Sequence, residues 1–350
     1  MAQPVMQGGR SYDDNSRLQR AIGANGSKAL DWVAEFVPLP DHGPVVMADY
    51  GSATGRNSID PVAIGLLALR RRMPRSQPIL VVHLDLSGND FTALFNTLDS
   101  TEGYGTGDPN AWTCAVGGSF YRQLLPASFV TLGWCATAVH WLSRVPCALT
   151  DTFWVDHAPR DQLARWAEQA AADWHDFLTA RAAELVPDGR IAIMSLRRSI
   201  DDANSYGPEA ARQASVLRGM VADGTIAQDE WDAMALPSYQ RSTEELLSPL
   251  QQEPLAGQLE IEAYADLVQP NPLWTHYEQT GDARAYADAS VGAARAAMEP
   301  ILSSCLDDAR AADDRDRVMN EFYARVRDVV VDDPCGVQAM ETAALILRRR

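Results

Sequence analysis

The sequence predicts an α/β fold, a doubly wound parallel sheet with an α-helical cap. Three observations support this prediction. Short apolar runs alternate with helical periodicity over about the first 200 residues, as strands and helices do in parallel sheets. Some of these runs are continuously apolar, which is typical of strands buried on both faces. Beyond residue 201 the strand signal fades, and prolines divide the rest of the chain into helical stretches.

The first half of the predicted sheet is easy to trace. A helical pattern covers residues 16–37 and is followed by a strand at 45–47. A helix that begins near residue 59 and ends near residue 69 leads to the apolar strand 78–86. Another helix is expected at 90–98.

The second half contains three more strand candidates. Residues 111–116 and 129–134 have strand character, and the second run is expected to continue into a helix at 136–142. A long helix at 161–185 ends in a Pro/Gly turn that leads to residues 190–196, the last clear strand. We therefore expect a core over residues 1–200 and a mainly helical cap over residues 201–350, part of which returns to the core.

Composition excludes several classes of partner. The net charge is −17, from 47 acidic and 30 basic residues. Such a surface repels nucleic acid and anionic membranes, so neither is an expected partner. The longest apolar stretch, residues 129–142, is too short and too polar to span a bilayer.

Cysteine and histidine usage points to a cytoplasmic protein without a metal. The 5 cysteines form no CxxC pair and are expected to be reduced. The N-terminal residues lack the apolar core of a signal peptide. The 6 histidines are scattered, and none has the spacing of a zinc motif, so we expect no metal site.

A glycine turn follows the first predicted strand. From Asp49 to Gly55 it reads D-x-G-x-x-x-G, which differs from the G-x-G-x-x-G of dinucleotide sites. An aspartate directly before this turn would repel a pyrophosphate, but it suits a cationic ligand such as the sulfonium of S-adenosylmethionine. Asp85, at the end of the next strand, could accept hydrogen bonds from ribose hydroxyls. By itself this pattern fits two interpretations. It can mark the cofactor site of a methyltransferase, or it can be a capped helix whose glycines only allow close packing.

Three further segments lie in order around the turn: "MQGGRSYDDNSRLQRAI", "LDLSGNDFTALF" and "VGGSFYRQLLPASFVTLGWCATAVHWLSRVP". Together they resemble the SABATH family of S-adenosylmethionine-dependent carboxyl methyltransferases, and the similarity continues through residues 184–199 and 221–246. That family esterifies small acids such as salicylate, benzoate, jasmonate and indole-3-acetate, and it N-methylates xanthines. The resemblance implies a Rossmann-like class I methyltransferase fold with a helical cap, and a homodimer.

The resemblance also implies roles for individual residues. Gln19 and Trp141 match the two side chains that hold the substrate carboxylate, and His140 matches a position that lines the substrate. Contacts to S-adenosylmethionine are implied for Tyr12, Ser16, Asp49, Gly51, Asn57, Asp85, Leu86, Ser119 and Phe120.

The chemistry of methyl transfer to a carboxylate explains the choice of an amide and an indole. The acceptor has a pKa near ~4 and is ionised at neutral pH, so no general base is needed. Positioning the reacting atoms at roughly 3–3.5 Å then supplies much of the rate enhancement. Neutral N–H donors orient the carboxylate, whereas an arginine would bind it strongly enough to reduce its nucleophilicity.

Three alternatives stay open. Methylation at nitrogen or at a phenol would require a base, for which His140 is the candidate. A catalytically silent cofactor-binding protein belongs to a different class, and a nicotinamide oxidoreductase is the weakest rival.

Small and polar residues at 204–221 suggest an acid larger or more polar than benzoate. The apolar residues expected to line its pocket are Trp274, Tyr277, Met298 and Phe322.

Overall fold

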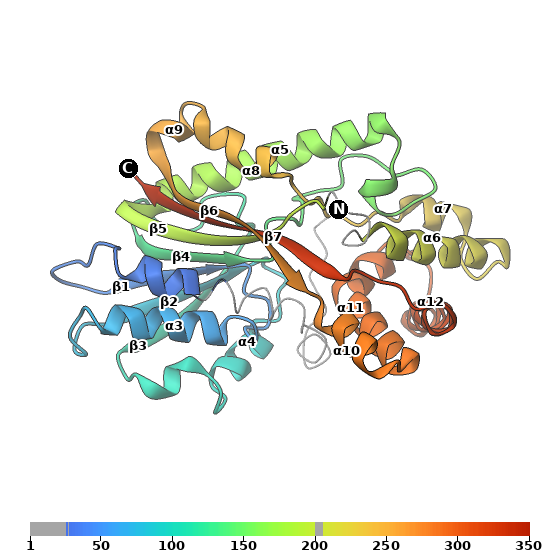
Figure 1. Ribbon diagram of the computed structural model, residues 1–350, viewed down its shortest axis with the longest axis horizontal. Coiled ribbons are helices and arrows are strands. Elements are labelled where there is room, and N and C mark those ends of the chain that lie inside the picture. Colours follow the sequence, from blue (N-terminus) through green and yellow to red (C-terminus); the bar gives the residue numbers. More distant parts are fainter. Residues whose placement is uncertain (1–25, 27, 200–205) are drawn as a thin grey trace.

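The computed structural model describes residue 26, residues 28–199 and residues 206–350. Tyr12, Ser16 and Gln19 lie outside these residues. Figure 1 shows one central sheet with helices on both faces and a group of helices beyond one end of its strands. Residues 28–34 are helical, within the range expected from the sequence.

The sheet contains seven strands in the order β3-β2-β1-β4-β5-β7-β6. Neighbouring strands among β1 to β5 are parallel, whereas β7 is antiparallel to both β5 and β6. The strand order reverses between β1 and β4, and this switch point is where open α/β sheets bind ligands. The strands are β1 (Val45–Tyr50), β2 (Ile79–Asp85), β3 (Ala111–Gly117), β4 (Val130–Ala136), β5 (Leu185–Leu196), β6 (Leu259–Pro270) and β7 (Ala339–Arg349).

The predicted strands up to residue 196 are confirmed, but the expectation that residues 190–196 are the last strand is wrong. The sheet ends with β7 and then β6, which lies at the edge. β6 is only partly buried over most of its length, so its sequence lacks a continuous apolar run. β7 is rich in alanine and ends in arginines, a composition that fits a helix equally well. Pairing of β7 with distant β5, and of β6 with β7, makes these segments strands rather than local propensity.

Helices α3 (Ile59–Arg70), α4 (Phe91–Leu98) and α5 (Arg160–Glu184) confirm the predicted helices of the core. α3 and α4 lie on one face of the sheet and α5 lies on the other (Figure 1). Leu66 of α3 and Leu94 of α4 belong to one buried cluster, and Phe177 of α5 belongs to a second. Burial of both faces explains why the strands could be read as continuous apolar runs.

The helix expected at 136–142 is wrong. This segment is a loop in which Thr137 has a positive φ of 49°, outside the helical region. Its backbone is hydrogen-bonded to other elements, since Thr137 N donates to Met194 O at 2.8 Å and Leu142 N donates to Pro237 O at 2.7 Å. Tertiary hydrogen bonds therefore replace helical ones in an apolar segment that has the composition of a helix.

Most helices beyond residue 206 form a separate group around a third buried cluster, which includes Leu217, Met298 and Phe322 (Figure 1). Its members are α6 (Gly207–Ala222), α7 (Gln228–Ala233), α10 (Pro272–Thr280), α11 (Ala283–Ser303) and α12 (Ala312–Asp332). The short helices α8 (Thr243–Leu247) and α9 (Leu255–Gln258) lie beside α5 in Figure 1. Within the described ranges, no helix has the length and apolar character that crossing a membrane would need.

Candidate active site

The turn after β1 lies at the switch point of the sheet. Gly51 has a φ of 89°, which favours glycine. A Cβ atom on Gly51 would lie 2.6 Å from the Cβ of Ala138 and 3.7 Å from a ring carbon of Phe120. The glycine therefore allows a close approach of three segments, namely the turn, the loop after β3 and the loop after β4.

Asp49 precedes this turn and is 2% exposed. Its Oδ2 accepts a hydrogen bond from Ser58 Oγ at 2.6 Å and lies 2.8 Å from His83 Nδ1. The other nitrogen of His83 lies 2.6 Å from the Tyr104 hydroxyl. These contacts join the ends of the turn to β2, so Asp49 stabilises the turn whether or not a ligand is bound.

Asp85 ends β2 and holds the same turn from the other side. Its Oδ2 accepts from Ala53 N and its Oδ1 accepts from Leu86 N, both at 2.7 Å. A carboxylate oxygen has two lone pairs, so each oxygen keeps one for a ligand hydroxyl. Burial raises the pKa of Asp85, the two backbone N–H groups oppose this rise, and the nearby charge of Asp49 adds to it.

The loop after β3 carries Ser119 and Phe120 and is anchored from α5. Arg181 is fully buried, donates to Phe120 O at 2.7 Å and forms an ion pair with Glu184 at 2.9 Å. Glu184 in turn accepts from the backbone N–H groups of Leu124 and Leu125. A buried ion pair thus determines where the ring of Phe120 meets the glycine turn.

Seven of the predicted cofactor residues are described, and all lie just beyond or at the carboxyl ends of β1, β2 and β3. These strands are neighbours, and their register aligns Tyr50 with Leu84 and Asp85 with Gly117. The structure therefore brings the predicted set to one edge of the sheet. It comprises Asp49, Gly51, Asn57, Asp85, Leu86, Ser119 and Phe120.

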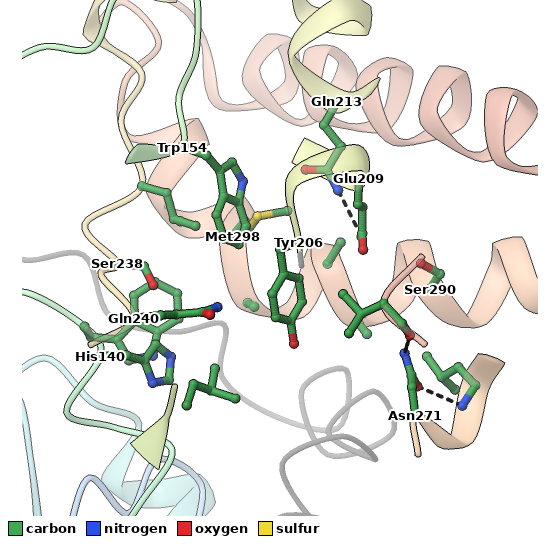
Figure 2. Close-up of a pocket in the computed structure, with 18 of the residues that line it drawn as sticks. His140, Trp154, Tyr206, Glu209, Gln213, Ser238, Gln240, Asn271, Ser290 and Met298 are labelled. Atoms are coloured by element: carbon green, nitrogen blue, oxygen red, sulfur yellow. Dashed lines mark hydrogen bonds between the residues drawn. The ribbon is translucent and has the colours of Figure 1, made fainter. Parts of the chain in front are cut away.

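A pocket of about 130 Å³ lies between this edge and the cap helices. Figure 2 shows His140, Ser238 and Gln240 toward one end and Glu209, Gln213 and Ser290 toward the other. The lining is largely apolar, with a few polar side chains, as in most small-molecule sites. Its residues are His140, Trp141, Trp154, Leu196, Tyr206, Glu209, Gln213, Leu236, Ser238, Gln240, Asn271, Leu273, Tyr286, Ser290, Ala293, Ala294, Ala297, Met298 and Val337.

The loop after β4 places Trp141 in the wall of this pocket. Trp141 forms an isolated β-bridge with Ser238, and its carbonyl accepts a hydrogen bond from the Tyr121 hydroxyl. Buried Arg241 donates to the carbonyl of Val139 and to that of Ala170, which lies on α5. Three distant segments, namely residues 238–241, the loop with Tyr121 and helix α5, therefore determine the path of the loop that carries the indole.

His140 lies beside Trp141, with ring centroids 5.1 Å apart, and is 6% exposed. Burial, helped by the nearby charge of Arg241, lowers its pKa to about 3. The ring is therefore neutral at physiological pH. Its Nδ1 has no hydrogen-bond partner among the described residues.

Sequence reasoning missed the polar residues that α6 and the residue before it contribute to the pocket. Tyr206, Glu209 and Gln213 are spaced i, i+3 and i+7, which places them on one face of a helix. The Tyr206 ring stacks on Trp154 with centroids 5.7 Å apart. This spacing was visible in the sequence, but which face of the helix meets a pocket depends on the tertiary structure.

The expected apolar lining is only partly as predicted. Met298 lines the pocket, whereas Phe322 is fully buried in the helical core. Trp274 and Tyr277 pack against Tyr286, with ring centroids 5.5 and 5.2 Å apart, and it is Tyr286 that reaches the pocket. In the described part of the chain, no three or more His, Cys, Asp or Glu side chains come together in a way that could hold a metal ion.

Comparison with known families identifies the chain. The family model described as SAM-dependent carboxyl methyltransferase, where SAM is S-adenosylmethionine, matches residues 3–348. The chain belongs to this family. The enzyme therefore uses S-adenosylmethionine, and the sequence-based identification of a SABATH methyltransferase is confirmed.

Its relatives methylate different acceptors. The enzyme is 27% identical to a jasmonate O-methyltransferase of Arabidopsis thaliana, over 92% of this chain and 91% of that protein. It is 26% identical to gibberellic acid methyltransferase 2 of the same plant, over 69% of each chain. A 3,7-dimethylxanthine N-methyltransferase of Camellia sinensis var. assamica is 26% identical over 98% of this chain and 94% of its own length.

The fold has a similar solved structure. Loganic acid methyltransferase with SAH superposes with a TM-score of 0.80 over 99% of both chains at 21% sequence identity. This similarity confirms the Rossmann-like class I methyltransferase fold that the sequence predicts. The residues present also fit the cofactor, since each carboxylate oxygen of Asp85 retains a lone pair for a hydroxyl group.

Proposed function

We propose that the enzyme forms the methyl ester of a small carboxylic acid, whose carboxylate is oriented by Gln19 and Trp141. The observation that carries this proposal is the loop of residues 137–141, which connects the two halves of the site. Ala138 packs against Gly51 of the turn, while His140 and Trp141 line the pocket. An acid held at Trp141 would thus lie close to the edge of the sheet that carries the cofactor residues.

On the cofactor side, S-adenosylmethionine supplies an electrophilic methyl group. We assign its binding to the seven residues gathered at the sheet edge, together with Tyr12 and Ser16, which lie outside the described residues. The lone pairs left on Asp85 suit the ribose hydroxyls, and Phe120, held by Arg181, offers an aromatic face beside the turn. Asp49 would contribute negative charge near a sulfonium while it stabilises the turn.

On the acceptor side, the residues orient the carboxylate and exclude water. The indole N–H of Trp141 donates one hydrogen bond, and the amide of Gln19 donates a second. His140 remains neutral because of its low pKa, so it can contact the substrate without adding a charge that would compete with the transfer. Orientation of this kind contributes several kcal/mol to catalysis, and no proton transfer is needed.

The second function expected from the sequence, methylation at nitrogen or at a phenol, requires a base. His140 was the candidate, but a pKa of about 3 makes it far too weak to deprotonate such an acceptor at neutral pH. The N-methyltransferase among the relatives keeps this alternative worth testing. The position of the new methyl group in the product decides between the two.

The test is methyl transfer from S-adenosylmethionine to a panel of small carboxylic acids, phenols and heteroaromatic N–H compounds, with products identified by mass spectrometry. We expect methyl esters. Trp141→Ala and Gln19→Ala should each reduce kcat/KM by about 100-fold or more, because orientation is lost. Affinity for S-adenosylhomocysteine, measured by calorimetry, should change by less than about 3-fold.

The matched control is Trp112→Ala, since Trp112 lies on β3 and is 61% exposed, remote from the pocket. Its kcat/KM should stay within about 2-fold of the wild-type value. Full activity of both the Trp141 and Gln19 variants would contradict their assigned role, and products methylated only at nitrogen or a phenol would contradict the ester.

We also propose the organisation expected from the sequence, with a cofactor core and N-terminal lid over residues 1–200 and a mainly helical cap over residues 201–350. The strands β6 and β7 support the return of part of the second segment to the core. A homodimer and a cytoplasmic location belong to the same proposal. Sedimentation equilibrium tests the dimer, which a monomer at micromolar concentration would contradict.

A further inference from the structure

One wall of the pocket carries polar side chains that the proposed chemistry does not use. Gln213 is 2% exposed, and its Nε2 donates to Glu209 Oε1 at 3.2 Å. Its Oε1 has no hydrogen-bond partner among the described residues, and the same holds for Trp154 Nε1. Both side chains line the pocket. A polar atom that is buried without a partner loses its bonds to water and gains none in return, so a ligand group that pairs with these atoms would bind favourably.

The two unpartnered atoms differ in chemistry. The amide oxygen of Gln213 is an acceptor, whereas the indole N–H of Trp154 is a donor. A hydroxyl group can donate to the first kind of atom and accept from the second. An ammonium group has no lone pair, and a ketone or ether oxygen has no hydrogen to donate, so each of these leaves one kind unpaired.

This wall does not coincide with the position assigned to the carboxylate. Figure 2 shows Glu209 and Gln213 toward one end of the pocket, and His140, the neighbour of Trp141, toward the other. Glu209 and Gln213 both lie on α6, whereas His140 lies on the loop after β4. A molecule that spans the pocket would thus meet different chemistry at its two ends.

We propose that Glu209, Gln213 and Trp154 form a subsite for a hydroxyl group that the substrate acid carries at a distance from its carboxyl group. The inference rests on the proposed function, because it takes the carboxylate to lie at Trp141. It narrows the substrate class to hydroxylated carboxylic acids.

The charge of this subsite is compatible with an anionic substrate. Burial raises the pKa of Glu209 to about 7, although the nearby Arg212 opposes the rise. Glu209 is therefore partly protonated at neutral pH, which reduces its repulsion of a substrate carboxylate in the same pocket. The other titratable groups that interact with Glu209 among the described residues are Tyr206, Tyr286 and Cys335. All three are neutral at this pH, because their ordinary pKa values of 9 to 10 lie above it and burial raises them further.

The experiment compares acids with and without the hydroxyl group, using the full-length enzyme. One pair is 3-(4-hydroxyphenyl)propanoic acid with 3-phenylpropanoic acid, and the other is 8-hydroxyoctanoic acid with octanoic acid. A fifth compound, 8-aminooctanoic acid, tests whether the subsite binds an ammonium group instead of a hydroxyl group. For at least one pair, wild type should prefer the hydroxylated member by about 10- to 100-fold in kcat/KM, the value of one or two buried hydrogen bonds. Mass spectrometry should place the methyl group on the carboxylate.

Two variants test the residues. Gln213→Leu should lower the preference to about 3-fold or less, and Trp154→Phe, which removes the N–H and keeps a ring, should lower it by about 5-fold. Gln228→Leu is the matched control on α7, where Gln228 is exposed and bonds to Asp232, and it should retain the wild-type preference. Calorimetry with S-adenosylhomocysteine checks that each variant is folded.

The outcomes separate the two proposals. If wild type methylates the acids of both pairs equally, or if the preference persists in both variants, the subsite is wrong and the carboxyl methyltransferase assignment stands. A preference for 8-aminooctanoic acid over 8-hydroxyoctanoic acid also overturns the subsite. If no acid is esterified, or if the hydroxyl group itself is methylated, the proposed function fails and the subsite fails with it.

Discussion

The sheet edge that we propose binds the cofactor and the pocket beside the cap helices are built in opposite ways. At the sheet edge, Asp49 and Asp85 are both held by hydrogen bonds from the protein, and the buried ion pair of Arg181 and Glu184 holds the loop of Phe120. In the pocket, by contrast, atoms of His140, Trp154 and Gln213 have no partner among the described residues. The contrast has exceptions on both sides. The Ser52 hydroxyl is buried in the turn without a described partner, whereas Asn271 and Tyr286 of the pocket wall donate to the carbonyls of Val337 and Cys335.

Under the proposed function, the contrast bears on how the two ligands are recognised. A cofactor shared by a whole family can be bound by a rigid edge that is complete before the ligand arrives. A substrate that differs between relatives is recognised by polar atoms that only the correct ligand pairs, because each unpaired atom penalises a wrong one. The following predictions test the two halves of this contrast.

The largest effect is expected from breaking the anchor of the cofactor edge. Arg181→Met should lower the free energy of unfolding by about 3–5 kcal/mol, because it leaves Glu184 buried without its cation and removes the hydrogen bond to Phe120. Urea denaturation measures this. Arg165→Met, at an exposed position of the same helix α5, is the control and should change stability by less than about 0.5 kcal/mol. Equal stability of the two variants would show that the edge does not depend on the ion pair.

A smaller effect is expected from altering one carboxylate of the edge. Asp85→Asn replaces one acceptor oxygen with an NH₂ group, which then faces a backbone N–H of Ala53 or Leu86. The Kd for S-adenosylhomocysteine should rise by about 10-fold or more in calorimetry. The control is Asp60→Asn, exposed in the first turn of α3, with an unchanged Kd. An unchanged Kd for the Asp85 variant would remove this residue from the cofactor site.

The smallest effect concerns the pocket and its pH dependence. The folded-state pKa of Glu209 is raised from 4.5 to about 7, so between these pH values the native state holds a proton that the unfolded state has lost. Stability therefore falls as pH rises through this window. Glu209→Gln should lack this contribution. Between pH 5 and 8 the variant should gain about 1 kcal/mol relative to wild type, less than the full shift implies, because Glu209 is partly exposed.

Urea denaturation of both proteins at several pH values measures this difference. The charged group nearest to Glu209 is Arg212, which also donates to Asp333. A constant difference between the two proteins from pH 5 to 8 would show that Glu209 is ionised in the pocket. That result would increase the difference between the sheet edge and the pocket, since the pocket would then carry the full negative charge of Glu209.

Much of the site could be read from the sequence because its signals are local. The turn from Asp49 to Gly55 lies within a few residues of β1, and Asp85 ends a continuous apolar strand, so both were placed correctly relative to the sheet. Trp141 was expected in the substrate site, and it lines the pocket, although on a loop instead of the predicted helix. The roles assigned to these residues remain predictions for the variants described above.

Local patterns were enough to predict the parallel core, the glycine turn and the cap of helices, because strand and helix periodicity and a positive φ at glycine are properties of neighbouring residues. Three other features could be established only from the folded chain, namely the strands β6 and β7, the loop at 137–141 and the polar wall of α6. Each of these depends on partners far away in the chain, such as β5 for β7 and Met194 for Thr137. Local propensity is weak compared with the hydrogen bonds and burial that such distant contacts provide.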